Sequence, residues 1–365
     1  MKKQKILVLT GGGDCPGLNA VIRGIHKAAM THGGYEIYGG IEAFNGLIKD
    51  PVEIIKLTKR KVGGIHVKGG TILKTTNKGN PLEYPTLMKD GTFTYKNVSD
   101  QVIKKIKKLG FEAVINIGGD GSQKISQALY EKGLNIIGVP KTIDNDLSAT
   151  DLTFGFSTAV QIATEAFDKL VTTAESHNRV MIMEVMGRDA GWIALHTAIA
   201  GGSEICLIPE IPFDIDVVIK KINKRYIKGK GFVNIVISEG AKLNDKIIGQ
   251  RKEGDANIKL GGVGNLLRHA LEEGGCKADI RVTSLGHTLR GGTPVAFDRI
   301  LATAFGVKAF ELVNAKNYGK MVSYTNNDVT ETTLKKATSS YNFVDKKHYL
   351  IRTAKALGIS FGEVQ

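Results

Sequence analysis

Short apolar runs alternate along the chain with longer stretches of helical periodicity. Strands are predicted at 5–10, 113–117, 135–139, 180–185, 204–208, 232–238 and 280–285. Several of these runs are apolar throughout, which is typical of parallel strands buried on both faces. Helices are predicted at 17–31, 98–109, 122–132, 158–176, 191–200, 214–228, 262–273 and 297–315. The order strand, glycine turn, helix, strand predicts a doubly wound α/β fold, in which ligands bind at the carboxyl ends of the strands.

Two segments interrupt this alternation. Residues 79–97 contain Pro81, Pro85 and Gly91, and residues 242–259 are polar and have no clear period. Proline, glycine and polar runs without periodicity are typical of connections rather than of core elements. We therefore expect both segments to be surface loops or small flaps.

Composition narrows the class of protein. The chain has 365 residues, of which 42% are hydrophobic and 24% charged, which suits two globular domains with sizeable cores. The net charge of +14 suits anionic ligands, but the basic residues are spread along the sequence, so no nucleic-acid partner is expected. Three scattered cysteines predict a reducing compartment, the cytoplasm. No apolar stretch is long enough to predict a membrane span.

Two glycine-rich segments follow predicted strands. The sequence has neither Gly-x-Gly-x-x-Gly with a following acidic residue nor Gly-x-x-x-x-Gly-Lys-Ser/Thr, so the common dinucleotide and Walker-type interpretations lose support. Residues 10–20 (TGGGDCPGLNA) follow the first strand, and residues 118–122 (GGDGS) follow the strand at 113–117. Backbone N–H groups of glycines, together with the positive end of the next helix, can bind phosphate oxygens. A plain tight turn is the structural alternative for the first segment.

Carboxylates stand beside two strand ends. Asp120, in the second glycine segment, could hold Mg²⁺ while the backbone binds phosphate, or it could cap the next helix. The segment 140–146 (PKTIDND) carries Asp144 and Asp146 two residues apart, with Thr142 before them. In an extended segment both carboxylates project to one side. A structural turn has no need of two carboxylates and Lys141 here, so we favour a general base beside a metal site over an Asx-type turn.

Cationic residues also follow predicted strands. Arginine binds phosphate with its forked donors, although any single arginine is more often part of a surface ion pair. Glu239 follows the strand at 232–238 and could accept hydrogen bonds from sugar hydroxyls, or could be an ordinary exposed carboxylate. The cationic candidates are Arg179, Arg188, Arg281, His287 and Arg290.

The ordered combination of these segments resembles the ATP-dependent 6-phosphofructokinases. The motifs that carry the resemblance are GGGDCPGLNAVIRG, GGDGS, PKTIDND, EVMGRDAG, AGG, PE, SEG and LGHTLRGGTP. The sequence is most similar to the longer bacterial, cyanobacterial-like branch that is sometimes grouped with mixed-substrate enzymes. The resemblance extends from Ile6 to about Gly306 and is less distinct beyond about residue 315.

The resemblance implies a nucleotide site. The residues that it assigns to ATP are Gly13, Lys78, Gly119, Asp120, Gly121 and Ser122. Asp120 is also the implied Mg²⁺ ligand. Lys78 stands where the family usually has an arginine near the transferred phosphate.

The resemblance also implies a fructose 6-phosphate site. Asp144 would be the base at the C1 hydroxyl, and Thr142, Asp146 and Arg188 complete the implied catalytic set. The residues assigned to the sugar phosphate are Thr142, Asp144, Arg179, Met186, Gly187, Arg188, Glu239, Arg281, His287 and Arg290. In the family, Arg179 and Arg281 reach into a neighbouring subunit's site, so the chain is expected to form a homo-oligomer, a dimer or a tetramer, with shared active sites.

By the same resemblance, the active site lies in the cleft between two doubly wound, Rossmann-like, three-layer domains. The ATP-binding domain is expected at 1–155 plus 289–340 and the fructose 6-phosphate domain at 156–288 plus 341–365. Residues Arg23, Glu204, Lys228 and Lys230 match the site where well-studied bacterial relatives bind ADP or phosphoenolpyruvate. Lys27 and Val171 replace expected arginines there, so different effectors are expected, if any.

Three alternatives stay open. A pyrophosphate-dependent phosphofructokinase is favoured by Lys141, whereas Gly121 leaves space for the α-phosphate of ATP, which the aspartate of pyrophosphate-using relatives would repel. We give Gly121 the greater weight, because lysine is compatible with either donor. An NAD kinase or lipid kinase shares the Gly-Gly-Asp-Gly turn but lacks the PKTIDND and HTLRGG segments. A non-catalytic regulatory subunit should have lost a carboxylate, yet Asp120, Asp144 and Asp146 are all present.

Overall fold

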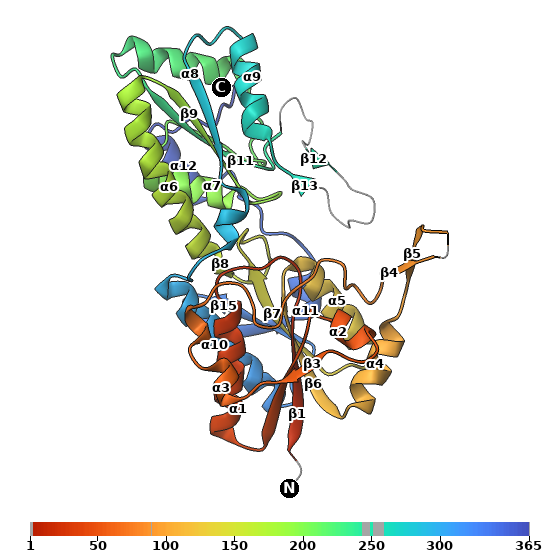
Figure 1. Ribbon diagram of the computed structural model, residues 1–365. Coiled ribbons are helices and arrows are strands. Elements are labelled where there is room, and N and C mark those ends of the chain that lie inside the picture. The colour runs from red at the N-terminus through yellow and green to blue at the C-terminus, as the bar shows by residue number, and fades with distance from the viewer. Residues whose placement is uncertain (1–2, 89, 243–248, 251–258, 365) are drawn as a thin grey trace.

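The computed structural model describes residues 3–88, 90–242, 249–250 and 259–364, and it has two lobes, each built around its own sheet (Figure 1). The larger sheet has the order β16-β15-β7-β6-β1-β2-β3, with β8 pairing β7. Its strands are β1 (Gln4–Thr10), β2 (Tyr35–Gly40), β3 (Ile54–Lys56), β6 (Phe111–Gly118), β7 (Ile136–Thr142), β8 (Phe154–Gly155), β15 (Lys320–Thr325) and β16 (Asp328–Thr333). The central pairs are parallel, and the edge strands β3 and β16 pair antiparallel.

The second lobe contains a four-stranded parallel sheet of order β10-β11-β9-β14. Its strands are β9 (Val180–Val185), β10 (Ile205–Leu207), β11 (Val233–Ser238) and β14 (Ile280–Ser284). Two further pairs stand apart from both sheets, β4 (Tyr84–Leu87) with β5 (Phe93–Lys96), and β12 (Gly249–Gln250) with β13 (Lys259–Leu260). Parallel strands buried on both faces explain why the predicted apolar runs coincide with the central strands of both sheets.

Helices cover the faces of both sheets. The helices of the larger-sheet lobe are α1 (Leu18–His32), α2 (Asn45–Ile48), α3 (Lys59–Val62), α4 (Ser99–Lys108), α5 (Asp120–Glu131), α10 (Ala296–Asn314) and α11 (Leu334–Ala337). Those of the second lobe are α6 (Phe156–His177), α7 (Trp192–Gly201), α8 (Ile215–Ile227), α9 (Val263–Glu273) and α12 (Tyr349–Ala356). The 3₁₀ turns η1 (Ile65–Val67) and η2 (Gly286–Arg290) complete the described elements. No helix of the described residues is long and apolar enough to cross a membrane.

The chain passes between the lobes more than once. It leaves the larger sheet through β8 into α6, returns through η2 into α10, and ends in the second lobe, where Ser360 pairs with Ile205. The expected return of the chain to the larger-sheet lobe is thus seen in β15 and β16, while the exact domain boundaries stay a prediction. Asp298 links two of these passages, because its buried carboxylate accepts hydrogen bonds from the backbone N–H and the hydroxyl of Thr158 at the start of α6 (2.7 and 2.5 Å).

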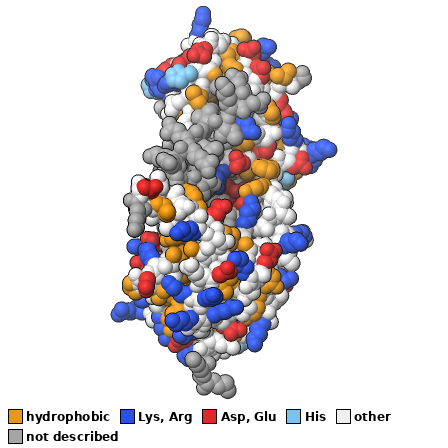
Figure 2. Space-filling model, turned by 90° about the vertical axis from the view of Figure 1, so that its right-hand side faces the viewer, with side chains coloured by type: hydrophobic (Ala, Val, Ile, Leu, Met, Phe, Trp, Pro, Cys, Tyr) orange, Lys and Arg blue, Asp and Glu red, His pale blue; other side chains and the backbone are white. Residues whose placement is uncertain are grey.

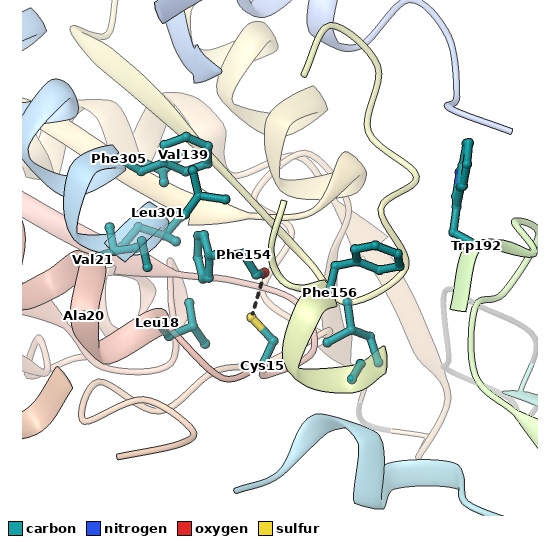
Figure 3. Close-up of a cluster of buried hydrophobic side chains, with 14 of the residues drawn as sticks. Cys15, Leu18, Ala20, Val21, Val139, Phe154, Phe156, Trp192, Leu301 and Phe305 are labelled. Carbon is teal, nitrogen blue, oxygen red and sulfur yellow. Dashed lines mark hydrogen bonds between the residues drawn. The ribbon is translucent and has the colours of Figure 1, made fainter. Parts of the chain in front are cut away.

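A cluster of buried apolar side chains packs against Cys15 in the first glycine loop (Figure 3). The Cys15 thiol donates to the carbonyl of Phe154 (3.7 Å), and the rings of Phe154 and Phe305 pack edge to face with centroids 6.3 Å apart. Both rings are fully buried, and each such side chain contributes about 1.5–3 kcal/mol of hydrophobic stabilisation. Gly17 has φ 112° and lies where a Cβ would be 2.6 Å from the Phe154 ring, so the loop requires glycine there.

The surface carries basic and acidic side chains together. On the face shown in Figure 2, lysine and arginine side chains are interspersed with acidic ones over the lobe of the larger sheet. They form no continuous basic stripe on that face of the described residues.

Of the two predicted surface excursions, the first contains structure. Residues 79–97 include the hairpin β4–β5, which projects from the larger-sheet lobe (Figure 1). The second, residues 242–259, lies mostly outside the described residues.

Candidate active site

A cavity of about 330 Å³ lies where the carboxyl ends of β1, β6 and β7 meet. That volume is within the range of small-molecule sites. It brings together many of the predicted residues, which come from segments far apart in the sequence. The predicted site residues among its lining are Gly13, Gly119, Asp120, Gly121, Ser122, Thr142, Asp144, Asp146, Arg188 and Arg290.

The two glycine loops form one wall of the cavity and pack against each other. A Cβ on Gly11 would come within 2.9 Å of the Ser122 hydroxyl, and a Cβ on Gly118 would come within 2.3 Å of it. The Ser122 side chain could not lie so close to these positions if either carried a Cβ, and a Cβ on Gly118 would also come within 3.1 Å of the carbonyl of Gly11 in the other loop. Gly121, by contrast, has no atom within 4 Å of the position of an added Cβ, so open space lies beside the first turn of α5.

Buried amides fix the strand ends that carry these loops. Gln123 is fully buried, and its side chain donates to the carbonyls of Gly118 at the end of β6 (2.8 Å) and Val139 in β7 (3.0 Å). Asn116 donates to the carbonyl of Ser122 (3.1 Å) and to the Ser126 hydroxyl (2.9 Å). These donated hydrogen bonds tie the ends of β6 and β7 to the first turns of α5, while the side-chain oxygens of Asn116 and Gln123 are buried without a partner.

The segment after β7 presents two carboxylates to the cavity, that of the buried Asp144 and that of the half-buried Asp146. Asp144 is 5% exposed, and its backbone N–H donates to the Thr142 hydroxyl (3.0 Å). Oδ1 of Asp144 and Oδ1 of Asp146 are both buried without a hydrogen-bond partner. Because a buried polar atom without a partner is costly, two such oxygens in one cavity indicate a ligand.

The environment of these carboxylates shifts their pKa values upward. Burial raises the pKa of Asp144, the nearby Glu239 raises it further, and the Arg290, Arg188 and Lys141 cations oppose the shift. Burial, followed by the charge of Asp144, raises the pKa of Asp146 to about 7. Carboxyl groups tuned in this way suit proton transfer near neutral pH.

Asn145, between the two carboxylates, holds the segment in shape. It has φ 53°, a left-handed conformation that asparagine tolerates better than most residues. Its side-chain oxygen accepts hydrogen bonds from the backbone N–H (3.0 Å) and the hydroxyl (3.3 Å) of Thr153. The Thr153 hydroxyl also donates to the carbonyl of Thr142 (2.8 Å). The turn therefore projects both acidic side chains from a fixed backbone.

Cations close the other side of the cavity. The Arg290 guanidinium lies against the first glycine loop, where a Cβ on Gly13 would be 2.5 Å from it. Arg188 has φ 50°, and its backbone N–H donates to the carboxylate of Glu239 (3.2 Å). Lys141 is buried, and its ammonium donates to the carbonyl of Gly13. Burial lowers the pKa of Lys141.

Other predicted residues lie around this cavity rather than in its lining. Lys78 is exposed between the lining residues Asn77 and Gly79. Met186 and Gly187 lead from β9 to Arg188 and are adjacent to the cavity in sequence. His287 is exposed in η2, three residues before Arg290.

Arg179 and Arg281 lie far from this cavity. They stand at the amino ends of β9 and β14, whereas Arg188 follows the carboxyl end of β9. The length of a six-residue strand separates the two ends by roughly 20 Å. Both arginines pair with Asp279 (2.7 and 2.8 Å). These two side chains therefore do not reach the site of their own chain.

The residues present fit a magnesium ion. Mg²⁺ prefers oxygen ligands and is usually held by one or two carboxylates together with substrate phosphates and waters. Asp120 and the unpartnered oxygens of Asp144 and Asp146 offer oxygen ligands in one cavity. The described residues contain no cluster of three or more histidine, cysteine or acidic side chains that would hold a metal without a substrate. A substrate-dependent magnesium site agrees with both observations.

Some lining residues were not predicted from the sequence. Tyr341 reaches the cavity from the C-terminal tail, and its hydroxyl donates to the Asp120 carboxylate (2.8 Å). No sequence motif indicated Asn116 either, because this residue lies inside an otherwise apolar strand. Gly11, Gly12 and Asp14 belong to the predicted phosphate loop, Lys141 and Ile143 belong to the predicted segment 140–146, and Asp189 belongs to the motif EVMGRDAG, although none was assigned a role in the site. The lining residues outside every predicted motif are Ala43, Phe44, Thr76, Asn77, Gly79, Asn80, Asn116, Ile125 and Tyr341. A glycine-loop motif identifies the strand end at which a ligand binds, but it does not identify the other segments that line the same cavity.

Comparisons with known protein sequences identify the same family that the ordered motifs resemble. A family model described as phosphofructokinase matches residues 5–313. The chain is 47% identical over 363 residues to a Clostridium perfringens protein named ATP-dependent 6-phosphofructokinase 2, with 99% of each chain covered. It is 44% identical over 364 residues to the ATP-dependent 6-phosphofructokinase of Chloroflexus aggregans, again with 99% of each covered. A Synechocystis protein, ATP-dependent 6-phosphofructokinase 1, is 42% identical with 98% of each covered.

Solved structures share the two-lobed architecture. The phosphofructokinase of Pichia pastoris in the T-state superposes with a TM-score of 0.78 at 28% identity, covering 98% of this chain and 36% of that longer chain. A pyrophosphate-dependent phosphofructokinase of Marinobacter aquaeolei gives a TM-score of 0.79 at 22% identity, covering 98% of this chain and 88% of that one. At 22% identity the likeness concerns the fold alone.

Proposed function

This chain belongs to the phosphofructokinase family, and from that premise we propose that it is an ATP-dependent 6-phosphofructokinase. It transfers the γ-phosphoryl group of ATP to the C1 hydroxyl of D-fructose 6-phosphate, giving fructose 1,6-bisphosphate and ADP. The observation that carries the proposal is the pair of carboxylates, each with a buried and unpartnered oxygen, facing two glycine loops across one cavity. Relatives at 42–47% identity over nearly the whole chain carry the same activity in their names.

Asp144 is the base of the proposed reaction. It accepts the proton of the C1 hydroxyl while that oxygen forms a bond to the γ-phosphorus. The bond from the γ-phosphorus to the oxygen bridging it to the β-phosphorus breaks, and ADP leaves with that electron pair. Phosphoryl transfer depends mainly on in-line positioning and on neutralising charge. A positioned base typically contributes about 10²–10⁴-fold to the rate.

The remaining residues position the two anions. The glycine loops and Ser122 line the nucleotide phosphates, and Arg188 and Arg290 attract the phosphates of both substrates. Mg²⁺, when bound with ATP beside Asp120, neutralises charge on the phosphates. The buried ammonium of Lys141 holds the carbonyl of Gly13 and so fixes the first loop.

A homo-oligomer with shared active sites is part of the proposal. Arg179 and Arg281 stand at the strand ends away from their own cavity, where both pair with Asp279, and in the proposed oligomer they bind the sugar phosphate of a second subunit. The fold keeps Cys15, Cys206 and Cys276 as buried free thiols, which supports a reducing compartment such as the cytoplasm.

A pyrophosphate-dependent enzyme is the second candidate, because Lys141 is the residue that such relatives carry. The open space beside Gly121 favours ATP, since a nucleotide needs room there for its α-phosphate. Lys141 donates to the loop backbone, a role that is compatible with either donor.

The test is product formation from fructose 6-phosphate and Mg²⁺ with one donor at a time. We expect fructose 1,6-bisphosphate with ATP and none above background with pyrophosphate. Activity with pyrophosphate alone would favour the second candidate and a readily reversible reaction. Activity with neither donor would contradict the proposal and favour another kinase or a non-catalytic role.

A further inference from the structure

The C-terminal tail reaches the cavity at Tyr341 and passes from there to the second lobe at residues 341–344, which we name the cross-lobe segment. It lies beyond residues 5–313, the part of the chain matched by the family model. Tyr341 lines the cavity at one end of this segment, and Val344 lies against the second lobe at the other. We propose that the cross-lobe segment is a positioning element for the reaction, in which Tyr341 orients the Asp120 carboxylate and Asn342 fixes the Asp144–Asp146 turn. This inference rests on the proposed function.

Tyr341 makes a direct contact with the candidate metal ligand. Its hydroxyl donates to Oδ2 of Asp120 (2.8 Å), and the Lys124 ammonium contacts the same oxygen (2.8 Å). Lys124 also donates to the Tyr341 hydroxyl (3.2 Å) and lies 4.9 Å from the centre of its ring. The three groups form a closed triangle, in which both contacts to the carboxylate use Oδ2 and neither uses Oδ1. Such partners orient a metal-binding carboxylate and hold one oxygen away from the ion.

Asn342 contacts the turn that carries the proposed base. Its backbone N–H donates to the carbonyl of Asp146 (2.9 Å), and its side-chain amide donates to the carbonyl of Asn145 (2.8 Å). Tyr341 also pairs with Leu147 as an isolated antiparallel bridge. The backbone that projects Asp144 and Asp146 is therefore held from one side by Thr153 and from the other by Asn342.

The cross-lobe segment is itself fixed in the second lobe. The indole N–H of Trp192 donates to the carbonyl of Asn342 (2.8 Å). The half-buried carboxylate of Glu210 accepts hydrogen bonds from the backbone N–H of Val344 (2.9 Å) and from that of Gly191 (2.9 Å), the residue before α7. One four-residue segment thus ties α7 to the metal carboxylate on α5 and to the turn after β7. The position of the cross-lobe segment therefore sets the geometry of Asp120 and Asp144, which must act on the same phosphoryl group.

The test separates the two contacts with two variants. Tyr341→Phe removes only the hydroxyl, and Asn342→Ala removes the amide donor. Tyr349→Phe, an exposed tyrosine in the same tail, is the control. ADP binding is measured by calorimetry in Mg²⁺ and in EDTA, kcat and KM are measured with ATP and fructose 6-phosphate, and melting temperatures report folding.

For Tyr341→Phe we expect binding of ADP with Mg²⁺ to weaken about 10-fold, as for other partners of metal ligands, while metal-free ADP binds as to the wild type. For Asn342→Ala we expect kcat to fall about 10-fold with nucleotide binding unchanged. Tyr349→Phe should match the wild type in every measurement.

Equal loss of ADP affinity with and without Mg²⁺ in Tyr341→Phe would overturn the role of the tyrosine. A lower melting temperature with unchanged kcat in Asn342→Ala would show a structural role alone and overturn the other half. The calorimetric comparison needs no turnover. Absence of fructose 6-phosphate phosphorylation in the wild type would therefore count against the proposed function and leave the Tyr341 result to be judged separately.

Discussion

Two single residues in the cavity, Gly121 and Lys141, carry the proposed choice of phosphoryl donor. Gly121 has open space where a side chain would begin, whereas Lys141 is fixed to the backbone of the facing loop. Donor choice in this account therefore depends on the shape and charge at position 121. The buried Lys141 has a structural role that is compatible with either ATP or pyrophosphate as the donor.

Gly121→Asp tests this account of donor choice. A carboxylate there would repel the α-phosphate, and like charges brought together in a binding site cost several kcal/mol. We expect kcat/KM for ATP to fall about 100-fold or more, measured with fructose 6-phosphate in excess. Gly121→Ala is the matched control, because it adds only a Cβ into open space. An unchanged kcat/KM for ATP in the aspartate variant would show that donor choice lies elsewhere.

The titration of the acidic pair predicts a pH dependence. Burial raises the pKa of Asp144, and it raises that of Asp146 to about 7. Asp144, the base, must be ionised, so kcat/KM for fructose 6-phosphate should begin to fall at a pH above about 4, the ordinary carboxyl value, as the pH is lowered. A pH–rate profile of the free enzyme measures this, and an acid limb near pH 4 would contradict it.

The same shifts have the opposite effect on stability. Because each pKa is higher in the folded state, the pair's contribution to folding is fully present below the unfolded value, about 4, and is lost as the pH rises through about 7. As the pH is lowered from about 8 to about 5, kcat/KM should therefore fall while the pair's contribution to the free energy of unfolding rises.

Sequence motifs identified the strand-end residues of the site but not their partners. Asp120, Asp144 and Gly13 belong to compact motifs whose chemistry is visible in a few residues, and the structure brings them to one cavity. Tyr341 and Asn342 come from a segment more than 190 residues after Asp146, with no charge or glycine pattern around them. Contacts made by a backbone N–H, such as that of Asn342, leave no trace in residue type at all.

At the scale of elements, the close crossing of α1 and α10 holds the larger-sheet lobe together. A Cβ on Gly306 would lie 2.4 Å from the carbonyl of Val21, and one on Gly24 would lie 2.6 Å from the carbonyl of Thr303. Backbone atoms in two packed helices cannot move apart without disturbing the core below them. Glycine at both positions is thus a condition of this packing.

Gly306→Ala is therefore expected to destabilise the fold. Overpacking costs about 1–3 kcal/mol, and the helix propensity of alanine returns only about 1 kcal/mol. We expect a melting temperature about 2–6 °C lower in a thermal scan. Gly63→Ala is the control, because its Cβ would meet its nearest neighbour at 3.4 Å, an ordinary contact. Equal melting temperatures for the two variants would contradict the close crossing.

The elements that the sequence predicted best are a strand that is buried throughout and an amphipathic helix with one buried face. The strand at 180–185 and the helix at 262–273 match β9 and α9 to within a residue. The sequence analysis did not predict β2, β15 or β16. Edge strand β16 has only exposed and half-buried positions and carries threonine and acidic residues, so it resembles a loop by composition. β2 ends in two glycines that pack under Leu73 and Leu9, contacts which only the folded chain defines.

At the scale of the whole molecule, one chain does not complete its own sugar-phosphate site in this account. Arg179 and Arg281 stand at the end of the second sheet away from the cavity. Asp144, in contrast, lies in the cavity of its own chain. If the arginines serve a neighbouring subunit, residues of two chains make each active site.

Mixed oligomers test this shared site. Asp144→Ala and Arg179→Ala should each be nearly inactive alone. Hybrids formed by dissociating and reassociating the two variants contain sites in which both residues are intact, so a substantial fraction of wild-type activity should return. Lack of any recovery in hybrids verified by mass spectrometry would contradict sharing between subunits.

The central claim is that Asp144 takes the proton from the C1 hydroxyl during transfer from ATP. The most direct measurement is kcat for fructose 1,6-bisphosphate formation by Asp144→Asn, with binding of ADP and fructose 6-phosphate followed by calorimetry. Asparagine keeps the shape but cannot accept the proton, so kcat should fall about 10²–10⁴-fold while both ligands still bind. Turnover at the wild-type rate would contradict the claim.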